Sequence, residues 1–533
     1  MKPGRLRLSS MTGFLAAFVF LSVLQNFDYP PGDSWSWRLL QPSIDVWLLL
    51  ILLAIAASCG KLTLRVTVLL VWILFLALRL LRIGDTVVPM YLNRPFNLYI
   101  DSGYLFGLYD LLKTTSPQGN FLLMSLSALA IMLGFVALSW YAWQAAACSL
   151  ADKRLRISVL VVSSLMVGAA FIGRWHPAET PAIVRLGREI LSIRHQLEEQ
   201  QAIVALIKKT IRTRGAEPIS LKGLEGADVL LFMVESYGHI VFNRPDYRQA
   251  MEATMTGFAE VLDRHGFMAV SSYLVSPTYG GASWLAHATL EFGLRVENDL
   301  EKTALLRSSL PPIASSFDKS GYRTVSVMPG TRLAFPEGAS YEYEQVYYSW
   351  HFEYRGPAFG WAPMPDQFVL DWVRRREFAR RDRPFFIRYV LISSHAAFSI
   401  QPPLIADWDA IGDGSIYNDR QPVHYPVHWP DLRNAGEAYL RSLDYEFTIF
   451  GDYLERYVGS DTLIIIMGDH QPNLQLTGSG RPWSVPVHII SRNPRLLEPF
   501  RKRNYTPGLI PAQPLPHAGM ETFMPDFLQD FSE

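Results

Sequence analysis

The stretch DTLIIIMGDHQPN (residues 461–473) is a run of apolar residues that ends in an acid and an imidazole. Such a continuous run is typical of a strand buried on both faces, which favours a parallel sheet covered by helices. Two more stretches are built in the same way: ADVLLFMVESYG (227–238) ends in Glu235, and PFFIRYVLISSH (384–395) ends in His395. Because ligands bind at the carboxyl ends of such strands, we expect these end residues to form a site.

Strand and helix patterns alternate through residues 223–533. We expect strands at 227–236, 267–275, 384–394, 461–469 and 485–491, helices at 247–266, 364–381 and 435–457, and a helix followed by a strand over 312–330. This alternation predicts an α/β domain, with a mostly parallel sheet between two layers of helices.

Glu235, Asp469 and His470 together suit a divalent metal ion. Their two carboxylates and one imidazole make a ligand set of the O,O,N type, which hard to borderline cations prefer. Singly, each has an ordinary explanation, because a glutamate at a strand end is usually just solvated and the sequence GDH recurs by chance. Their joint position at strand ends indicates a metal site.

Ser283 lies in the stretch SPTYGGASWLAHATLEFG (276–293), after two glycines and at the start of a predicted helix. A serine in this place is often only an N-cap. The glycines, however, let the backbone approach a ligand closely, and the helix start attracts anions. With its oxygen on a metal ion, the serine would be a nucleophile toward phosphorus or sulfur. We therefore expect Ser283 to be catalytic and to cap the helix as well.

The N-terminal part of the chain is strongly apolar. Hydrophobic residues make up 49% of the 533 residues and are concentrated before about residue 175. Five stretches are candidate membrane spans, of which the first two are short: Gly13–Leu24, Val46–Ser58, Leu64–Leu81, Phe121–Ala147 and Ile157–Ile172. The first also resembles a signal peptide, but no small-residue cleavage site follows it, so we expect a retained helix. Residues 1–175 are thus predicted to form a five-helix transmembrane domain.

The basic loops predict the orientation in the membrane. Lys and Arg cluster at the N-terminus and after the second and fourth spans, which puts these segments in the cytoplasm and residues 223–533 outside. Cys59 and Cys148 then lie at cytoplasmic ends of spans, so the outer domain has no disulfide. The net charge of zero, from 49 basic and 49 acidic residues, gives no indication of nucleic-acid binding.

Residues 176–222 connect the two domains. Pro177 and Pro181 interrupt the chain, and apolar residues then recur at helical spacing from Ala182 to Arg212. This pattern predicts an amphipathic linker helix that lies on the membrane or on the catalytic domain. A solvated connecting helix is the alternative.

The motifs MVESYG, GGASWLAH, YVLISSHAAF, IMGDHQPN and VPVHII resemble, in this order, those of the alkaline phosphatase and sulfatase superfamily. The whole chain is similar to its membrane-bound phosphotransferase branch, typified by lipoteichoic acid synthase. The resemblance implies one ion, Mn²⁺ or Zn²⁺ rather than Mg²⁺, held by Glu235, Asp469 and His470. Ser283 would be the fourth ligand and the nucleophile, where the synthases have threonine. His395 would contact the substrate phosphate or protonate the leaving group.

The chain also departs from that family. The synthases grip the head group with a His-Gly-Asn stretch and a Trp-Asn-Arg run, whereas this chain has VMPGTRLAFPEG, so Arg332 is the expected phosphate-binding cation. The related phosphoethanolamine transferases usually have several disulfides in the outer domain, which are absent here. The segment FGWAPMPDQFVLDWV (359–373) also resembles these enzymes, and we expect it to be structural.

Three more histidines are candidate substrate contacts. His287 lies one helical turn beyond Ser283 and can face the site. His488, near the end of the last predicted strand, is either a substrate contact or a hydrogen-bonded core histidine. His351 lies beside Trp350 in an aromatic loop that would line a sugar or lipid cleft.

We therefore expect a membrane phosphotransferase. A phosphoglycerol-like or phosphoethanolamine-like head group would pass from a phospholipid donor to Ser283, and then to a glycan or lipid acceptor. The resemblance and the basic loops imply the bacterial inner membrane, with a periplasmic or extracellular catalytic domain. A phosphodiesterase that uses water is the alternative; a sulfatase lacks support because the C/S-x-P-x-R motif is missing, and an inactive membrane scaffold is the third hypothesis.

Overall fold

The computed structural model describes residues 3–27, 41–104, 113, 120–172, 182–215, 217–333, 335–427 and 431–532. The chain divides into two compact units. One comprises residues 1–89 and 94–197, and the other comprises residues 90–93 and 198–533. The division at residue 197 falls inside helix α8 (Ala182–Arg214). The domain boundaries predicted at residues 175 and 222 stay predictions.

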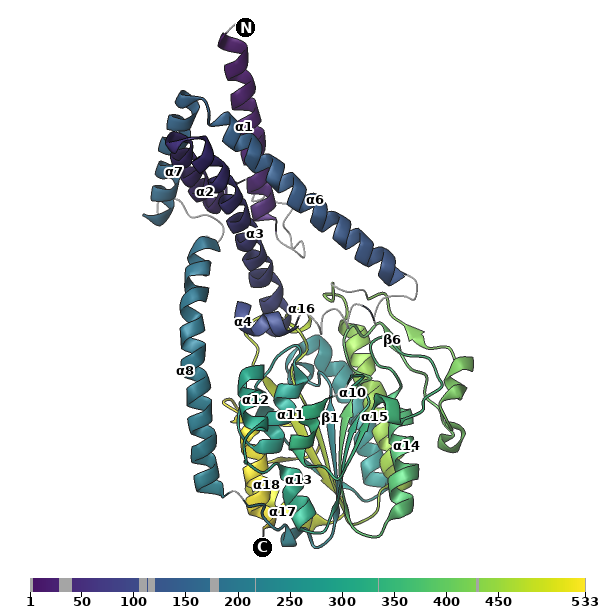
Figure 1. The fold of residues 1–533 in the computed structure, drawn as a ribbon. Coiled ribbons are helices and arrows are strands. Elements are labelled where there is room, and N and C mark those ends of the chain that lie inside the picture. Colours follow the sequence, from purple (N-terminus) through teal and green to yellow (C-terminus); the bar gives the residue numbers. More distant parts are fainter. Residues whose placement is uncertain are drawn as a thin grey trace. The chain divides into compact units, whose positions relative to one another are not determined.

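The first unit is helical (Figure 1). Its described elements are α1 (Pro3–Asn26), α2 (Ile44–Cys59), α3 (Lys61–Leu92), α4 (Leu98–Asp101), the 3-10 helix η2 (Ser102–Tyr104), α6 (Asn120–Ser149), α7 (Lys153–Phe171) and the start of α8. Two apolar segments are long enough to cross a membrane, Leu62–Leu92 and Phe121–Ser149, and two are shorter, Met11–Asn26 and Ile44–Cys59. The fifth predicted span lies in α7, which is not among these apolar segments of the described residues, so the prediction of five membrane spans is supported only in part.

The helices of the first unit share an apolar core that includes Leu50, Phe75 and Trp143. A buried acid fixes one helix start within this unit. The carboxylate of Asp45 accepts hydrogen bonds from the backbone N–H groups of Ala182 and Ile183, each at 3.1 Å, and so satisfies free donors at the start of α8. Cys59 and Cys148 are both free thiols.

The second unit is built on one nine-stranded sheet. The strand order is β10-β2-β9-β8-β1-β5-β3-β4, and β11 pairs with β2. The strands are β1 (Asp228–Val234), β2 (Met268–Val275), β3 (Arg323–Met328), β4 (Gln345–Tyr348), β5 (Phe385–Leu391), β8 (Thr462–Gly468), β9 (Ser484–Ser491), β10 (Thr506–Pro507) and β11 (Ala518–Gly519). The five strands from β8 to β4 are parallel, whereas β9 is antiparallel to both β8 and β2.

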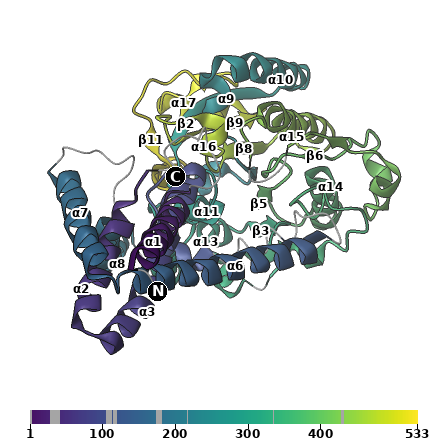
Figure 2. The ribbon, with the colours of Figure 1, turned by 90° about the horizontal axis from the view of Figure 1, so that it is seen from above.

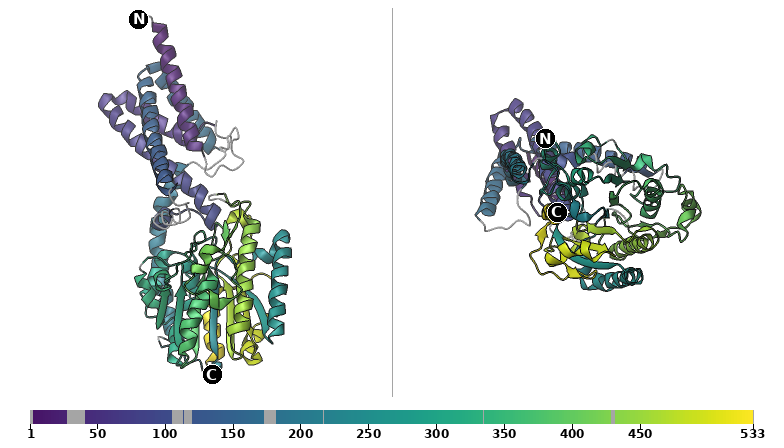
Figure 3. Two further views of the ribbon diagram at one scale, coloured as in Figure 1. Left: turned by 90° about the vertical axis from the view of Figure 1, so that its right-hand side faces the viewer. Right: turned by 90° about the horizontal axis from the view of Figure 1, so that it is seen from below.

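Helices cover both faces of this sheet (Figures 2 and 3). The seven residues of β1 are all buried, and alternate ones pack on opposite faces. One face packs on α10 (Pro245–Arg264), α14 (Asp366–Glu377) and α15 (Gly436–Tyr457). The other packs on α11 (Ser283–Phe292), α13 (Ile313–Lys319), α17 (Pro494–Lys502) and α18 (Phe523–Phe531). The predicted layer of mostly parallel strands between helices is therefore confirmed.

Smaller elements complete the second unit. They are the helices α9 (Ile240–Asn243), α12 (Asp299–Leu306) and α16 (Leu474–Thr477), and the antiparallel pair of β6 (Ile400–Gln401) and β7 (Val423–His424). The 3-10 helices are η3 (Lys222–Leu224), η4 (Pro336–Tyr341), η5 (Ser349–His351), η6 (Phe378–Arg380), η7 (Trp408–Ala410), η8 (Ser415–Asp419) and η9 (Met520–Thr522). The sequence patterns did not predict the short strands β4, β10 and β11, because two to four residues are too few for a period to show.

The second part of α8 packs on the rest of the second unit. Ile203 and Ile207 are buried against an apolar cluster that includes Ala288 and Phe292 of α11. At the end of α8, the guanidinium of Arg214 donates hydrogen bonds to the backbone oxygens of Phe292 and Gly293, at 2.6 and 2.8 Å. The linker helix was predicted to lie on the membrane, to lie on the domain of residues 223–533, or to be solvated. For the part of α8 after residue 197, the structure shows contact with that domain.

Candidate active site

The register of two parallel strands brings the acidic residues together. Val234 of β1 lies opposite Gly468 of β8, so Glu235 and Asp469 leave the sheet side by side. A Cβ atom on Gly468 would lie 1.9 Å from the backbone oxygen of Tyr237, which explains why glycine precedes Asp469. Glu235 is 7% exposed and Asp469 is 1% exposed, so both carboxyl groups are removed from bulk water.

His470 is held with one ring nitrogen toward the acids. Its Nδ1 lies 2.8 Å from the backbone oxygen of Gln471, an arrangement in which Nδ1–H donates and Nε2 is left for a ligand. Nε2 lies 3.2 Å from Oε1 of Glu235 and 3.8 Å from Oδ2 of Asp469. One ligand atom from each of the three residues lies within 4.8 Å of the others.

The loop that carries Ser283 is fastened to the same strand end. It leaves β2 at Val275, and Ser276 donates a hydrogen bond to the backbone oxygen of Asp469 at 2.6 Å. Further along, the N–H of Gly280 donates to the backbone oxygen of Gln471 at 2.9 Å. Gly281 has φ of +156°, which side chains rarely allow, and α11 begins directly after Ala282.

Ser283 points into the acidic group. Its Oγ donates a hydrogen bond to Oε2 of Glu235 at 2.9 Å and lies 3.3 Å from Nε2 of His470. It is the first residue of α11, whereas Ala282 is in the cap position and makes no side-chain cap hydrogen bond. The expectation that Ser283 also caps the helix is therefore wrong, because its hydroxyl bonds to the acidic group instead.

Burial and mutual charge shift the pKa values of this group. Burial, and then the charge of Glu235, raise the pKa of Asp469 well above its usual range. Burial alone would lower the pKa of His470, but the charges of Asp469 and Glu235 outweigh it and raise the pKa to about 9. Burial likewise opposes ionisation of Glu235, yet the adjacent His470 lowers its pKa below the ordinary value. The two buried acids thus favour a positive charge beside them, which a bound cation would supply.

The donor set fits a single divalent ion. Two carboxylates and one imidazole, with the hydroxyl of Ser283 next to them, form a four-donor set of the type that Zn²⁺ and Mn²⁺ accept. Ligand bonds of about 2.0–2.2 Å bridge the observed spacing after small side-chain movements. Among the residues that the structure describes, Glu235, Asp469 and His470 are the one such group of three or more ligands.

His395 lies at the end of β5, in a loop next to this group. Its Nδ1 is 2.6 Å from the backbone oxygen of Ala396, so Nδ1–H donates and Nε2 is available to a substrate. Burial lowers the pKa of His395, and the charge of Glu235 acts in the opposite direction. The ring stacks on the indole of Trp361, with centroids 4.0 Å apart and planes 16° apart.

Arg332 and Trp361 lie together on the same side as His395. The guanidinium carbon of Arg332 is 5.2 Å from the centroid of the Trp361 ring, and Nη2 donates to the backbone oxygen of Trp361. The positive charge of Arg332 also lowers the pKa of His395, so the two side chains are neighbours. The sequence reasoning missed Trp361, since it assigned the segment 359–373 a structural role.

His287 is buried behind the candidate site. It is 6% exposed, and none of the described residues forms a hydrogen bond with its Nε2. Burial, and then the charge of Arg388, lower its pKa to about 3, while Glu235 acts in the opposite direction. His287 is therefore buried and within electrostatic range of Glu235, and its substrate contact stays a prediction.

His488 belongs to the core. Its strand, β9, is antiparallel to β8, so the carboxyl end of β9 lies at the sheet edge away from Glu235 and Asp469. The side chain is 0% exposed, with Nε2 2.9 Å from the hydroxyl of Tyr237 and Nδ1 2.7 Å from that of Ser271. This geometry favours the core alternative over the expected substrate contact, because both ring nitrogens already have partners.

His351 closes a short turn. Its Nδ1 accepts a hydrogen bond from the backbone N–H of Tyr348 at 2.9 Å, and its ring packs on Trp350, which is 50% exposed. A sugar or lipid cleft along this loop stays a prediction.

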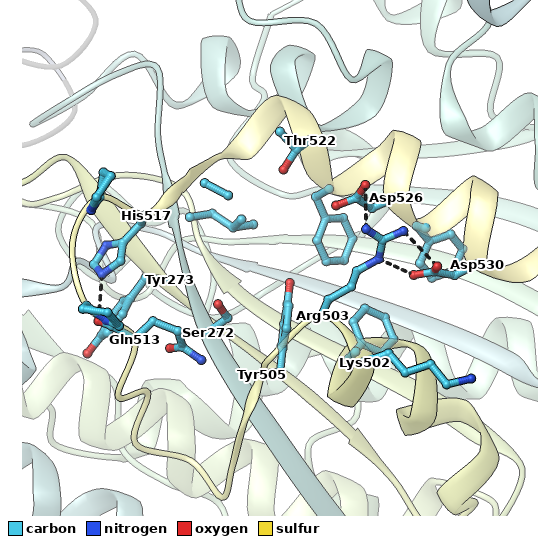
Figure 4. Close-up of a pocket in the computed structure, with 17 residues that line it drawn as sticks. Ser272, Tyr273, Lys502, Arg503, Tyr505, Gln513, His517, Thr522, Asp526 and Asp530 are labelled. Carbon is cyan, nitrogen blue, oxygen red and sulfur yellow. Dashed lines mark hydrogen bonds and ion pairs between the residues drawn. The ribbon is translucent and has the colours of Figure 1, made fainter.

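A cavity of about 550 Å³ lies elsewhere in the second unit (Figure 4). It is lined by residues of β2, of the end of α17 and of the segment that leads into α18, and it contains none of the predicted site residues. Its arginine, Arg503, is neutralised by Asp526 at 3.0 Å and Asp530 at 2.7 Å. This cavity therefore offers no unpaired arginine to a phosphate.

Comparisons with known proteins bear on the fold. No family model and no curated protein matches the sequence. Among solved structures, the chain is similar to the lipoteichoic acid synthase LtaP from Listeria monocytogenes, with 14% identity and a TM-score of 0.37, over 53% of this chain and 71% of that chain. It is also similar to the C-terminal periplasmic domain of EcEptC from Escherichia coli in complex with Zn, with 11% identity and a TM-score of 0.34, over 51% and 74%.

A third similar structure is the phosphoglycerol transferase GacH from Streptococcus pyogenes in complex with sn-glycerol-1-phosphate, with 11% identity and a TM-score of 0.34, over 63% of this chain and 92% of that one. The similar structures also include a protein of the alkaline phosphatase superfamily from Vibrio parahaemolyticus, with 15% identity and a TM-score of 0.33, over 50% of this chain and 60% of that one. Identities and TM-scores this low carry no argument about this chain, so its proposed reaction rests on the geometry of its own residues.

Proposed function

We propose that this chain is a metal-dependent phosphotransferase. It would move a phospho-head group, such as phosphoglycerol or phosphoethanolamine, from a membrane phospholipid to Ser283, and from there to a glycan or lipid acceptor. The observation that carries this proposal is the position of Ser283 Oγ, which is 2.9 Å from Glu235 and 3.3 Å from His470 at the start of a helix. A hydroxyl in this place has a proton acceptor beside it and donor N–H groups around it for an anion.

Glu235, Asp469, His470 and Ser283 would hold the ion, which would be Mn²⁺ or Zn²⁺. Such an ion would supply positive charge for the phosphate and lower the pKa of the serine hydroxyl. The rest of the chemistry belongs to the protein. In the first half of the reaction, Ser283 Oγ bonds to phosphorus, the phosphorus–oxygen bond to diacylglycerol breaks, and the serine proton ends on the released diacylglycerol hydroxyl.

In the second half, the acceptor hydroxyl attacks the phosphoserine. Neutral His395 is suited to this step, because its Nδ1–H is engaged by Ala396 and its Nε2 is left to take the proton of the acceptor. The leaving Ser283 oxygen regains a proton, which restores the enzyme. Arg332, next to His395, would bind the phosphate oxygens.

The apolar N-terminal helices support a membrane donor. A chain that carries segments such as Leu62–Leu92 and Phe121–Ser149 would keep its catalytic unit near lipid head groups and so raise their effective concentration. The basic loops support a position of this unit outside the membrane, which we propose to be the cytoplasmic membrane of a bacterium. Ser283 is itself half-buried, so water can also reach it, and hydrolysis of the same phosphodiester is the second candidate.

One experiment separates these two functions. The full chain in detergent, supplied with Mn²⁺ or Zn²⁺, is incubated with labelled phosphatidylglycerol or phosphatidylethanolamine, with and without a glycan acceptor. Diacylglycerol release that needs the acceptor supports transfer, and release without it supports hydrolysis. Intact mass spectrometry should show a phosphoglycerol or phosphoethanolamine adduct on Ser283. No release with either lipid, metal or acceptor would contradict both functions.

A further inference from the structure

Two buried carboxyl groups lie behind the loop that carries His395. Asp366 is the first residue of α14, and Glu446 lies in the middle of α15, which packs on α14. Both side chains are 0% exposed, and neither belongs to the candidate metal group. An ionised carboxyl group in the protein interior costs free energy unless hydrogen bonds, an opposite charge or a proton compensate its charge.

Asp366 fastens the loop between β5 and His395. Its Oδ2 accepts hydrogen bonds from the backbone N–H groups of Ile392 and Ser393, at 2.8 and 2.5 Å, and its own N–H donates to Ser393 Oγ at 3.0 Å. The next residue, Ser394, donates to the backbone oxygen of Glu235 at 2.7 Å. The loop is thus tied on one side to α14 and on the other to the strand end that carries Glu235.

Three carboxyl oxygens of the pair lack a donor. Within the described residues, Oδ1 of Asp366 and both oxygens of Glu446 have no hydrogen-bond partner. Two ionised carboxylates in one dry place repel each other, so one of them takes a proton. Burial, and then the charge of Asp366, raise the pKa of Glu446 well above its usual range, although the N–H groups of Ser393 and Ser394 act against this. Burial raises the pKa of Asp366 as well, while the nearby carboxyl group of Glu446 acts in the opposite direction.

We propose that Glu446 is protonated and donates its proton to Asp366, and that this pair positions the loop that carries His395. The shared proton removes the repulsion between the two carboxyl groups and gives Oδ1 of Asp366, its one unpaired oxygen, a donor. The other oxygen then keeps its charge for the N–H groups of Ile392 and Ser393. Asp366 and Glu446 are positioning residues, since neither touches the candidate metal group. The consequence for turnover rests on the proposed function, whereas the proton sharing does not.

Infrared spectroscopy tests the proton directly. The full chain in detergent is compared with Glu446→Gln and Glu446→Ala, and with the control Glu437→Gln, which changes an exposed glutamate on the same helix. A buried protonated carboxylic acid gives a carbonyl band that is separate from those of carboxylates and amides. The spectra are recorded with Mn²⁺, so that Asp469 would hold the ion and not a proton. We expect this band in the wild type and in the control, and its loss in both Glu446 variants. An unchanged band in Glu446→Gln would overturn the proposal.

The positioning role has two further readouts. Glutamine can still donate an N–H group to Asp366, so Glu446→Gln should keep the amide exchange protection of residues 392–395 and a kcat within about twofold of wild type. Alanine removes the donor, so we expect lost protection and a kcat lower by about tenfold to a hundredfold, with unchanged Mn²⁺ affinity. If Glu446→Gln loses protection as fully as Glu446→Ala, the proposal is wrong.

These readouts also separate this inference from the proposed function. Should the wild type prove inactive on phospholipids, the infrared band and the amide exchange still decide whether the pair shares a proton. Should Glu446→Ala fail to fold, the comparison of Glu446→Gln with wild type and control remains decisive.

Discussion

The hydroxyl of Ser283 donates a hydrogen bond to Glu235 over 2.9 Å, although 48 positions separate the two residues in the chain. The contact joins the start of α11 to the end of β1, and it directs the serine oxygen toward the candidate metal group. The closeness of these two side chains is the basis of the proposed phosphoserine mechanism, and several measurements can test it.

Replacing the nucleophile should abolish turnover without removing the ion. In Ser283→Ala, the three ligands Glu235, Asp469 and His470 remain, so Mn²⁺ or Zn²⁺ should still bind and the adduct seen by mass spectrometry should disappear. Activity should fall by about a thousandfold or more. Ser283→Thr keeps a hydroxyl in the same place and should retain part of the activity. Full activity in Ser283→Ala would remove this residue from the mechanism.

Metal removal should lower both activity and stability. A chelator should abolish turnover, and Mn²⁺ or Zn²⁺ should restore it. An ion present at about a hundred times its dissociation constant stabilises the folded state by about 2.7 kcal/mol, which thermal unfolding detects. In Asp469→Asn, we expect metal affinity to fall by more than about a hundredfold, since even indirect contacts cost that much. Unaltered calorimetric titrations in this variant would contradict the ligand assignment.

Trp361 should act through His395. Its indole stacks on the imidazole, and an aromatic contact of this kind contributes about 0.5–1.5 kcal/mol. Trp361→Ala should therefore lower kcat/KM by about twofold to tenfold, whereas Trp361→Phe keeps a ring and should recover most of the loss. Steady-state kinetics on a labelled phospholipid measures both. If kcat/KM falls equally in the two variants, ring stacking on His395 is not the reason for the loss.

A buried ion pair should anchor the helix that begins with Ser283. Nη1 of Arg388 on β5 donates to Oε1 of Glu291 on α11 at 3.0 Å, and the two side chains are 2% and 0% exposed. Glu291→Gln leaves Arg388 without its counter-charge and should cost about 3–5 kcal/mol of unfolding free energy. Arg383→Met breaks an exposed pair with Glu344 and should cost about 1 kcal/mol or less. Denaturant unfolding compares the two, and similar costs would contradict the buried role.

The core histidine His488 should make stability depend on pH. Burial lowers its pKa from the ordinary 6.5 to about 3, so the unfolded chain takes up a proton between these values and the folded chain does not. Stability is therefore present above about pH 6.5 and is lost as the pH falls, by about 1.4 kcal/mol per pH unit for this group. His488→Gln should reduce the dependence of the unfolding free energy on pH by the contribution of one proton, whatever its effect on the stability itself. Unfolding free energies at several pH values measure the slope, and an unchanged slope would refute the assignment.

The sequence by itself predicted the layers of the second unit and the acidic strand ends. Long apolar runs such as residues 461–468 predict strands that are buried on both faces, because nearly every residue of the run is apolar. The end residues of parallel strands then lie at the same edge of the sheet. Glu235, Asp469 and His470 could be chosen on that ground, and Ser283 because two glycines precede it and a predicted helix follows. The apolar N-terminal stretches likewise predicted helices, since length and composition are local properties.

The tertiary structure decided what no local pattern contains. The antiparallel direction of β9 moves His488 away from the site, and only strand pairing shows that direction. Trp361 stacks on His395, and Asp366 lies near Glu446, although the members of each pair are far apart in the sequence. Neither periodicity nor composition predicts such contacts. The roles of such side chains depend on the residues that contact them in the folded protein, and these contacts cannot be predicted from the local sequence.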